Sequence, residues 1–269
     1  MRTTLPPPPR PEPAFGRVIG VRELPPPPTD EPPTPPRWRW LAVGLAAAWL
    51  SGFVLPRNFT WFLCALPHEM GHASIGCLLG RPSTPAIALH GEAWAGIAEL
   101  QPWLVWVMAL AAASLAVHQR RRLTVAVPLA LLALAVPLLA FSRGADLLIA
   151  AGGHLGELAF ATWCFTMAWT GGRTGTPQER AACAMAGGLV QFTVLRLGFG
   201  LWTDIAARSL YEQNGSLGLK NDLLVIAEDL LACRLQPVAM LMFVAALLPL
   251  PLGLWIGSRR GATNDDDSG

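Results

Sequence analysis

Seven long apolar segments dominate the chain and restrict it to a membrane environment. They lie at about residues 38–56, 59–80, 103–118, 123–141, 145–169, 181–202 and 237–256. A helix needs about 20 mainly apolar residues to cross the hydrocarbon core of a bilayer, and most of these segments reach that length. Only 14% of the residues are charged and the mean hydropathy is +0.41, whereas about 25% of the residues of a soluble domain are charged. We therefore predict an integral, multi-pass membrane protein.

The two ends of the chain differ in composition from this apolar middle. Residues 1–36 contain the runs LPPPPRPEP and LPPPPTDEPPTPP, in which proline excludes helices and central strands. We predict a disordered proline-rich tail over 1–36, a transmembrane domain over 37–257 and a disordered acidic tail over 258–269. The proline-rich tail is either a plain spacer or a docking site for a proline-reading partner.

Charge and cysteine content argue against a nucleic-acid-binding protein and against a fold held by disulfides or a zinc ribbon. The net charge is only +2 and the basic residues are scattered between apolar segments, so we expect no nucleic-acid partner. The five cysteines are odd in number, contain no CxxC pair and lie mostly in apolar runs, which is typical of buried thiols. Lys220 is the only lysine. This preference for arginine favours a GC-rich bacterial genome, so we expect the protein in a bacterial cytoplasmic membrane.

Basic residues beside the apolar segments give conflicting orientations. Arg37 and Arg39, the HQRRR run at 118–122 and the SRR run at 258–260 would all be cytoplasmic under the positive-inside rule, which seven full crossings do not allow. We expect the exception at 82–102, whose prolines, Gly91-Glu92 turn and partial apolar alternation suit a hairpin, a re-entrant loop or an exposed loop. The predicted fold class is an all-α polytopic membrane protein with six to seven transmembrane helices, with a re-entrant hairpin after the second segment as one alternative.

The second apolar segment contains the motif HEMGH at residues 68–72. Positions i and i+4 of a helix lie on one face, so His68 and His72 can bind one metal ion while Glu69 acts on its water. A charged side chain at a helix centre costs about 2.5–3.5 kcal/mol, which a bound zinc ion would offset. The alternatives are a polar pair between packed helices, a haem site or a proton relay. Pro67 removes a backbone donor and predicts a kink or a restart of the helix before His68.

A catalytic zinc ion commonly has three protein ligands, so a third is expected outside this motif. His154 and Glu157 lie three residues apart in the fifth segment, where polar side chains need partners. Glu157 could instead pair with Arg196 of the sixth segment. Asp222 precedes another apolar stretch and is a further candidate. The residues alone leave these alternatives open.

The sequence HEMGHA at 68–73 resembles the site-2-protease-like intramembrane zinc metalloproteases, in particular small bacterial relatives without a PDZ domain. The family motif is HExGH, and Gly71 matches its glycine. The third ligand of the family is an aspartate near the start of a later helix, in a pattern like SDAxxLA, to which NDLLVIA at 221–227 is similar. The resemblance implies zinc ligation by His68, His72 and Asp222 in a metalloprotease-like domain over 37–257.

The resemblance also implies an activity. It is that of an intramembrane zinc-dependent endopeptidase, in which Zn²⁺-activated water hydrolyses peptide bonds of membrane-embedded substrates and Glu69 is the general base. The expected substrate is a single-span membrane protein or a signal-peptide remnant, held extended by strand pairing with the 82–102 segment. Two other functions stay open: a metal- or proton-handling membrane protein, and a non-catalytic membrane scaffold docked through the proline-rich tail.

Overall fold

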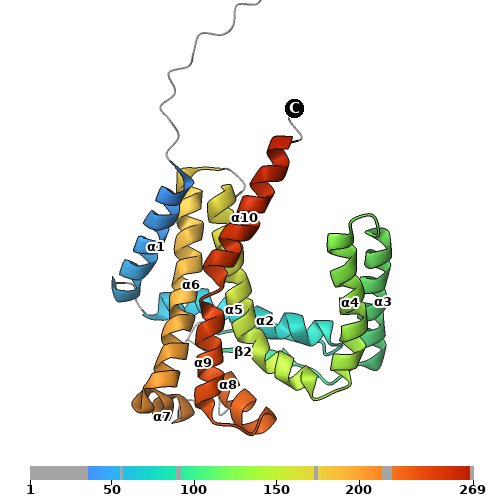
Figure 1. Cartoon of the computed structure of the whole chain (residues 1–269). Coiled ribbons are helices and arrows are strands. Elements are labelled where there is room, and N and C mark those ends of the chain that lie inside the picture. Colours follow the sequence, from blue (N-terminus) through green and yellow to red (C-terminus); the bar gives the residue numbers. More distant parts are fainter. Residues whose placement is uncertain (1–35, 55–56, 89–91, 173–174, 214–219, 267–269) are drawn as a thin grey trace, which may run out of the picture. The chain divides into compact units, whose positions relative to one another are not determined.

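The computed structural model describes residues 36–54, 57–88, 92–172, 175–213 and 220–266. Residues 1–35 form a separate unit and lie outside the described residues, so the predicted proline-rich tail is described only at Pro36. The other unit is mainly helical and contains one hairpin (Figure 1). Its elements are α1 (Arg37–Val54), α2 (Arg57–Leu78), β1 (Ser83–Ile87), β2 (Ala93–Ile97), α3 (Pro102–His118), α4 (Leu123–Ala140), α5 (Gly144–Thr170), α6 (Pro177–Thr203), α7 (Ile205–Gln213), α8 (Asp222–Leu224), the π-helical η2 (Val225–Leu230), α9 (Leu235–Ala246) and α10 (Pro249–Asp266).

Where the structure describes them, the seven predicted apolar segments are mainly helical, and four helical stretches are long and apolar enough to cross a membrane. These are α4, α5, α6 and the stretch Leu235–Arg259, which joins α9 to α10. The last predicted segment is therefore interrupted, because Pro249 and Pro251 follow the end of α9 and disfavour helical conformation in the residues before them. Helix α10 continues to Asp266, beyond the predicted domain boundary at residue 257.

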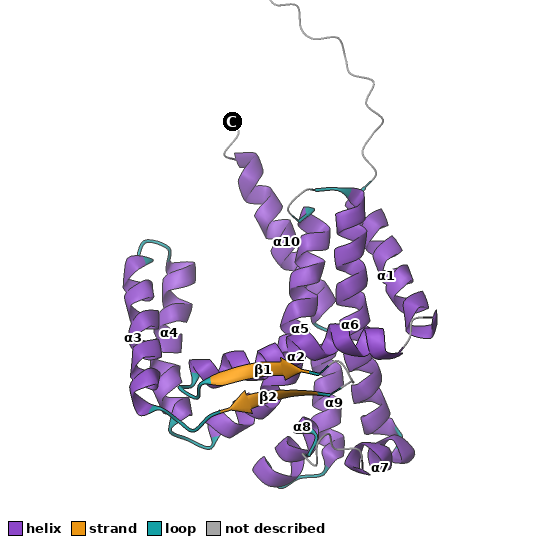
Figure 2. Cartoon of the chain, turned by 180° about the vertical axis from the view of Figure 1, so that it is seen from behind, coloured by secondary structure: helices purple, strands orange, loops and turns teal. Residues whose placement is uncertain are grey.

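Helix α2, which carries the HEMGH motif, was predicted as a span but is not among these four stretches. It lies across the direction followed by α1, α3, α4 and α6 in both views (Figures 1 and 2). The polar side chains of His68, Glu69 and His72 lower its apolar content, so it gains less from contact with lipid than its neighbours do. Its main partners are α5 and the hairpin, and it also contacts α6.

Strands β1 and β2 form the hairpin that the 82–102 segment predicts as one alternative. They pair antiparallel, with Ser83 opposite Ile97 and Ile87 opposite Ala93. Figure 2 shows the two strands running alongside α2. Entry of this hairpin into the bilayer stays a prediction, as does the total of six to seven crossings.

Helix α5 is central because it packs against α2, α6 and α10. Its crossing with α2 depends on glycines, since a Cβ atom at Gly71 would overlap the carbonyl oxygen of Gly152. A Cβ atom at Gly156 would likewise overlap the carbonyl oxygen of Pro67. The GxxxG spacing at 152–156 thus permits close approach of two helix backbones, as is common where helices pack in membranes. This close approach brings the motif of α2 against the first half of α5.

The basic segments whose orientations conflict in the sequence lie at one end of the molecule. Figure 1 shows that the start of α1, the α3–α4 connection and the last turns of α10 all lie at the same end. These segments carry Arg37 and Arg39, the arginines at 120–122, and Arg259, respectively. Helix α2 lies across the other helices and joins the far end of α1, through the hairpin, to the start of α3. The three basic segments can therefore lie at one end although the chain passes through α1, α2 and α3 between the first two of them (Figure 1).

Candidate metal centre

His68 and His72 project from one face of α2, as the i, i+4 spacing predicts. Their Nε2 atoms lie 3.2 Å apart. Helix α2 runs without interruption from Arg57 to Leu78 and includes Pro67, so the predicted restart before His68 does not occur. Cys64, one turn earlier, is buried in the core between α1, α5 and α6.

Asp222, the first residue of α8, brings a carboxylate to the two imidazoles. Its Oδ2 atom lies 2.8 Å from Nε2 of His68 and 3.1 Å from Nε2 of His72. The preceding residue, Asn221, donates a hydrogen bond of 2.6 Å to the carbonyl oxygen of Tyr211 in α7 and so fixes the start of α8. The structure thus brings together the three residues that the family resemblance implies, although 154 positions separate His68 from Asp222.

The ligand atoms fit a tetrahedral zinc ion. Zinc binds nitrogen and oxygen at about 2.0–2.1 Å, which places ligand atoms about 3.3 Å from one another; the observed separations are 2.8–3.2 Å. Nδ1 of His72 lies 2.6 Å from the carbonyl oxygen of Ile149, which can only accept, so this nitrogen carries the proton. In a neutral His72 ring the lone pair is then on Nε2, the atom that faces Asp222 and His68. A cation could bind this lone pair together with the Asp222 carboxylate.

The backbone of α5 forms one wall of the candidate centre. A Cβ atom at Gly153 would overlap both Nε2 of His68 and Nε2 of His72. Only glycine at this position leaves room for the two imidazoles and an ion. The side chains of His68 and Asp222 retain 19% and 27% exposure, so the described residues do not fully enclose the centre.

Glu157 and His154, the alternative ligands, lie on the far side of His68. Oε2 of Glu157 is 3.5 Å from Nδ1 of His68 and 2.7 Å from Nδ1 of His154. These two contacts engage Nδ1 of His68, whereas Asp222 lies at Nε2, so Glu157 is not part of the same triad. The alternative pairing of Glu157 with Arg196 is wrong, because Arg196 is exposed and the carboxylate contacts the two histidines.

Glu69 follows His68 on α2 and is 7% exposed. Within the described part of the chain, no hydrogen bond to a neighbouring side chain holds its carboxylate. Its side chain is therefore not fixed by another described residue, unlike the side chains of His68 and His72.

The sequence did not indicate two contributors to this centre. One is the carbonyl oxygen of Ile149, which fixes the tautomer of His72. The other is Gly153, which follows the first glycine of the GxxxG pair. Its contact with the two histidines depends on the packing of α2 against α5. The glycine-rich run AGGHLG at 151–156 was the available signal for a close approach.

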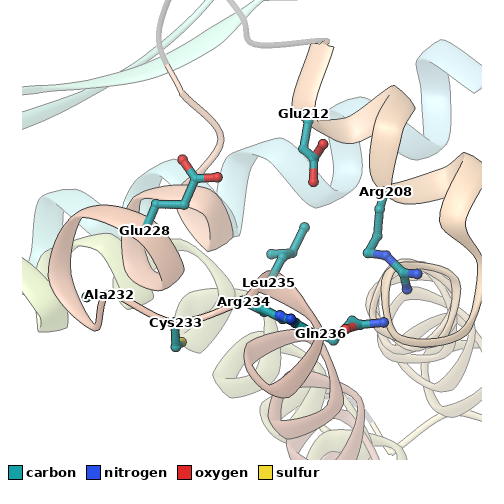
Figure 3. A pocket seen from close by; sticks show the side chains of 8 residues that line it. All are labelled: Arg208, Glu212, Glu228, Ala232, Cys233, Arg234, Leu235 and Gln236. Carbon is teal, nitrogen blue, oxygen red and sulfur yellow. The ribbon is translucent and has the colours of Figure 1, made fainter.

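A separate polar hollow of about 550 Å³ lies between α7 and the connection from η2 to α9 (Figure 3). Figure 3 shows Arg208 and Glu212 projecting from one side and Glu228 from another. None of the three candidate metal ligands lines it. It is an open surface depression with charges of both signs, and it is distinct from the candidate metal centre.

Comparison with known proteins found no matching family model, no matching curated protein and no matching solved structure.

Proposed function

We propose that this chain is an intramembrane zinc-dependent endopeptidase, similar in its site to the site-2-protease-like metalloproteases. One observation carries the proposal: the two HEMGH histidines and Asp222, from elements far apart in sequence, place three ligand atoms within 3.2 Å of one another. A carboxylate, Glu69, lies next to the first histidine in a buried position. This combination is typical of metallohydrolases, in which two histidines of HExxH and a third residue bind zinc and the glutamate is the base.

Each residue of the proposed centre would have a separate role in hydrolysis. When bound, zinc would acidify a water molecule and polarise the scissile carbonyl group. His68, His72 and Asp222 would hold the ion, and the carbonyl oxygen of Ile149 keeps His72 in the required tautomer. The Glu69 carboxylate would take a proton from the attacking water and deliver it to the leaving amine nitrogen.

The hairpin beside α2 offers a way to hold the substrate. Peptide bonds of a transmembrane helix are protected by their own hydrogen bonds, so a substrate must unwind before it is cut. Each strand of the two-stranded sheet has one edge without a strand partner inside the sheet. An unwound segment of a single-span membrane protein or a signal-peptide remnant would add to such an edge, with main-chain hydrogen bonds providing the affinity.

We also propose six crossings in the bacterial cytoplasmic membrane: α1, α3, α4, α5, α6 and the joined α9–α10. The end that carries the basic segments would face the cytoplasm. A membrane-impermeant maleimide is then expected to label Arg121→Cys only after the cells are opened, because residue 121 lies in the α3–α4 connection. It should label Glu212→Cys on α7 in intact cells. The chain without added cysteines gives the background, and the reverse labelling pattern would show that the proposed orientation is inverted.

The activity is tested in membranes from cells that contain or lack the gene. Mass spectrometry of peptide termini should find new termini within single-span segments only when the protein is present and zinc is not chelated. Termini that form equally in membranes lacking the protein would contradict the proposal.

The ligand set is tested by zinc content. Asp222→Ala is expected to lose bound zinc almost completely after dialysis, because the ion would keep only two protein ligands. Glu157→Ala should retain measurable zinc, since its carboxylate lies behind His68. Zinc retained by Asp222→Ala and lost by Glu157→Ala would transfer the third-ligand role to Glu157.

A further inference from the structure

Glu157 is a buried carboxylate within an apolar helix, and the ligand triad does not use it. Its exposure is 6%. A carboxylate in such a place is costly unless it is paired. Among the described residues its partners are two imidazoles, with Nδ1 of His154 at 2.7 Å and Nδ1 of His68 at 3.5 Å from the same oxygen, Oε2. The helix therefore accommodates Glu157 through its contacts with these two rings.

The contact with His68 is made at the nitrogen opposite the candidate ligand atom. Nε2 of His68 faces Asp222 at 2.8 Å, and Nδ1 faces Glu157. Both carboxylates accept hydrogen bonds, but only a proton on Nδ1, the atom that faces Glu157, is compatible with a metal ion at Nε2. In a neutral ring this leaves the lone pair on Nε2, where a metal ion can bind it.

His72 shows the same arrangement with a different acceptor. Its Nδ1 atom donates to the carbonyl oxygen of Ile149, which like Glu157 belongs to α5. In both ligand histidines of α2, the Nδ1 atom thus faces an oxygen atom of α5. The rings of His68 and His154 lie edge to face with centroids 4.8 Å apart, so His154 supports the ring of His68 as well as binding Glu157.

We propose that Glu157 is a positioning residue that orients His68 and fixes its tautomer for metal binding, with His154 holding the Glu157 carboxylate in place. The inference rests on the proposed zinc site. Carboxylates that receive a hydrogen bond from a ligand histidine raise its basicity and restrict its rotation. Glu157 would act through His68 and would not contact the ion.

Zinc affinity provides the test, measured on the purified full chain by competition with a chelator. Glu157→Gln is expected to weaken zinc binding by about 10- to 100-fold, the usual loss when such a partner is removed. Glu212→Gln, a matched change of an exposed glutamate on α7, should leave the affinity unchanged. Equal affinities of Glu157→Gln and wild type would overturn the inference, whereas a wild type without zinc would refute the proposed function itself.

A double-mutant cycle separates positioning from a general effect on stability. If Glu157 acts through His68, Glu157→Gln should cause little further loss of affinity in a His68→Ala background. It should cause its full loss in a His72→Ala background, because Ile149 orients His72. Each background keeps only two protein ligands, so the affinities are measured by titration with excess zinc and not by the zinc retained after dialysis. An equal further loss in both backgrounds would indicate a structural role and overturn the inference.

A measurement on the wild type covers the case in which Glu157→Gln does not fold. ¹⁵N spectra of the zinc-loaded, histidine-labelled protein should show a protonated Nδ1 and a metal-bound Nε2 for His68, assigned by its loss in His68→Ala. A metal-bound Nδ1 would contradict the proposed role of Glu157.

Discussion

Replacing Glu69 by glutamine is expected to abolish peptide-bond cleavage while zinc stays bound. The amide has nearly the same size as the carboxylate but does not accept a proton from water or pass one to the leaving nitrogen. Removal of a general base costs about 10²- to 10⁴-fold in rate. The loss is measured as the yield of new peptide termini in single-span segments, with zinc per chain determined on the same preparations.

The matched control for this change is Glu212→Gln, which alters an exposed carboxylate outside the centre and should leave cleavage intact. Retained cleavage by Glu69→Gln would contradict the protease mechanism and favour a metal- or proton-handling protein. Loss of zinc together with cleavage would instead show that Glu69 supports the metal site and would remove the evidence for its role as a base.

Replacing Gly153 by alanine is expected to weaken zinc binding by about 100-fold or more while the fold persists. The added methyl group would overlap the Nε2 atoms of His68 and His72 and force both rings to move. A metal site requires its ligands within about 0.5 Å of their productive positions, so even a small displacement is costly. Chelator competition measures the affinity, and thermal unfolding of the metal-free protein in detergent checks the fold.

Gly52→Ala is the control for this prediction, because a Cβ atom at Gly52 in α1 would meet no atom within 4 Å. It should change neither the zinc affinity nor the unfolding temperature by a measurable amount. Unchanged zinc affinity in Gly153→Ala would mean that the ion does not lie between the two histidines and α5.

The helices and the motif face could be predicted from the sequence because both depend on local patterns. Apolar runs of sufficient length predicted the seven apolar helical segments but not α7, α8 or η2, and the i, i+4 spacing of His68 and His72 predicted their common face. The direction of α2 could not be predicted in this way. Hydropathy describes how well a segment tolerates lipid, whereas the crossing of α2 with α5 is set by glycine contacts between two distant segments.

The third ligand and the backbone contacts of the centre could not be predicted from the residues alone. Polar residues alone did not decide between Asp222, His154 and Glu157, since each had a carboxylate or imidazole in a suitable context. The fold separates them by the face of the His68 ring that they reach: Asp222 at Nε2 and Glu157 at Nδ1. Contacts of backbone groups, such as that of the Ile149 carbonyl with His72, cannot be predicted from the pattern of side chains.

Zinc content of the gently purified wild-type protein decides whether His68, His72 and Asp222 form a zinc site. One zinc ion per chain is expected after dialysis without chelator, and the His68→Ala, His72→Ala double variant should contain almost none. This result would establish that the convergence of His68, His72 and Asp222 is a metal site. A wild type that contains no zinc and does not take it up when zinc is added would contradict the account.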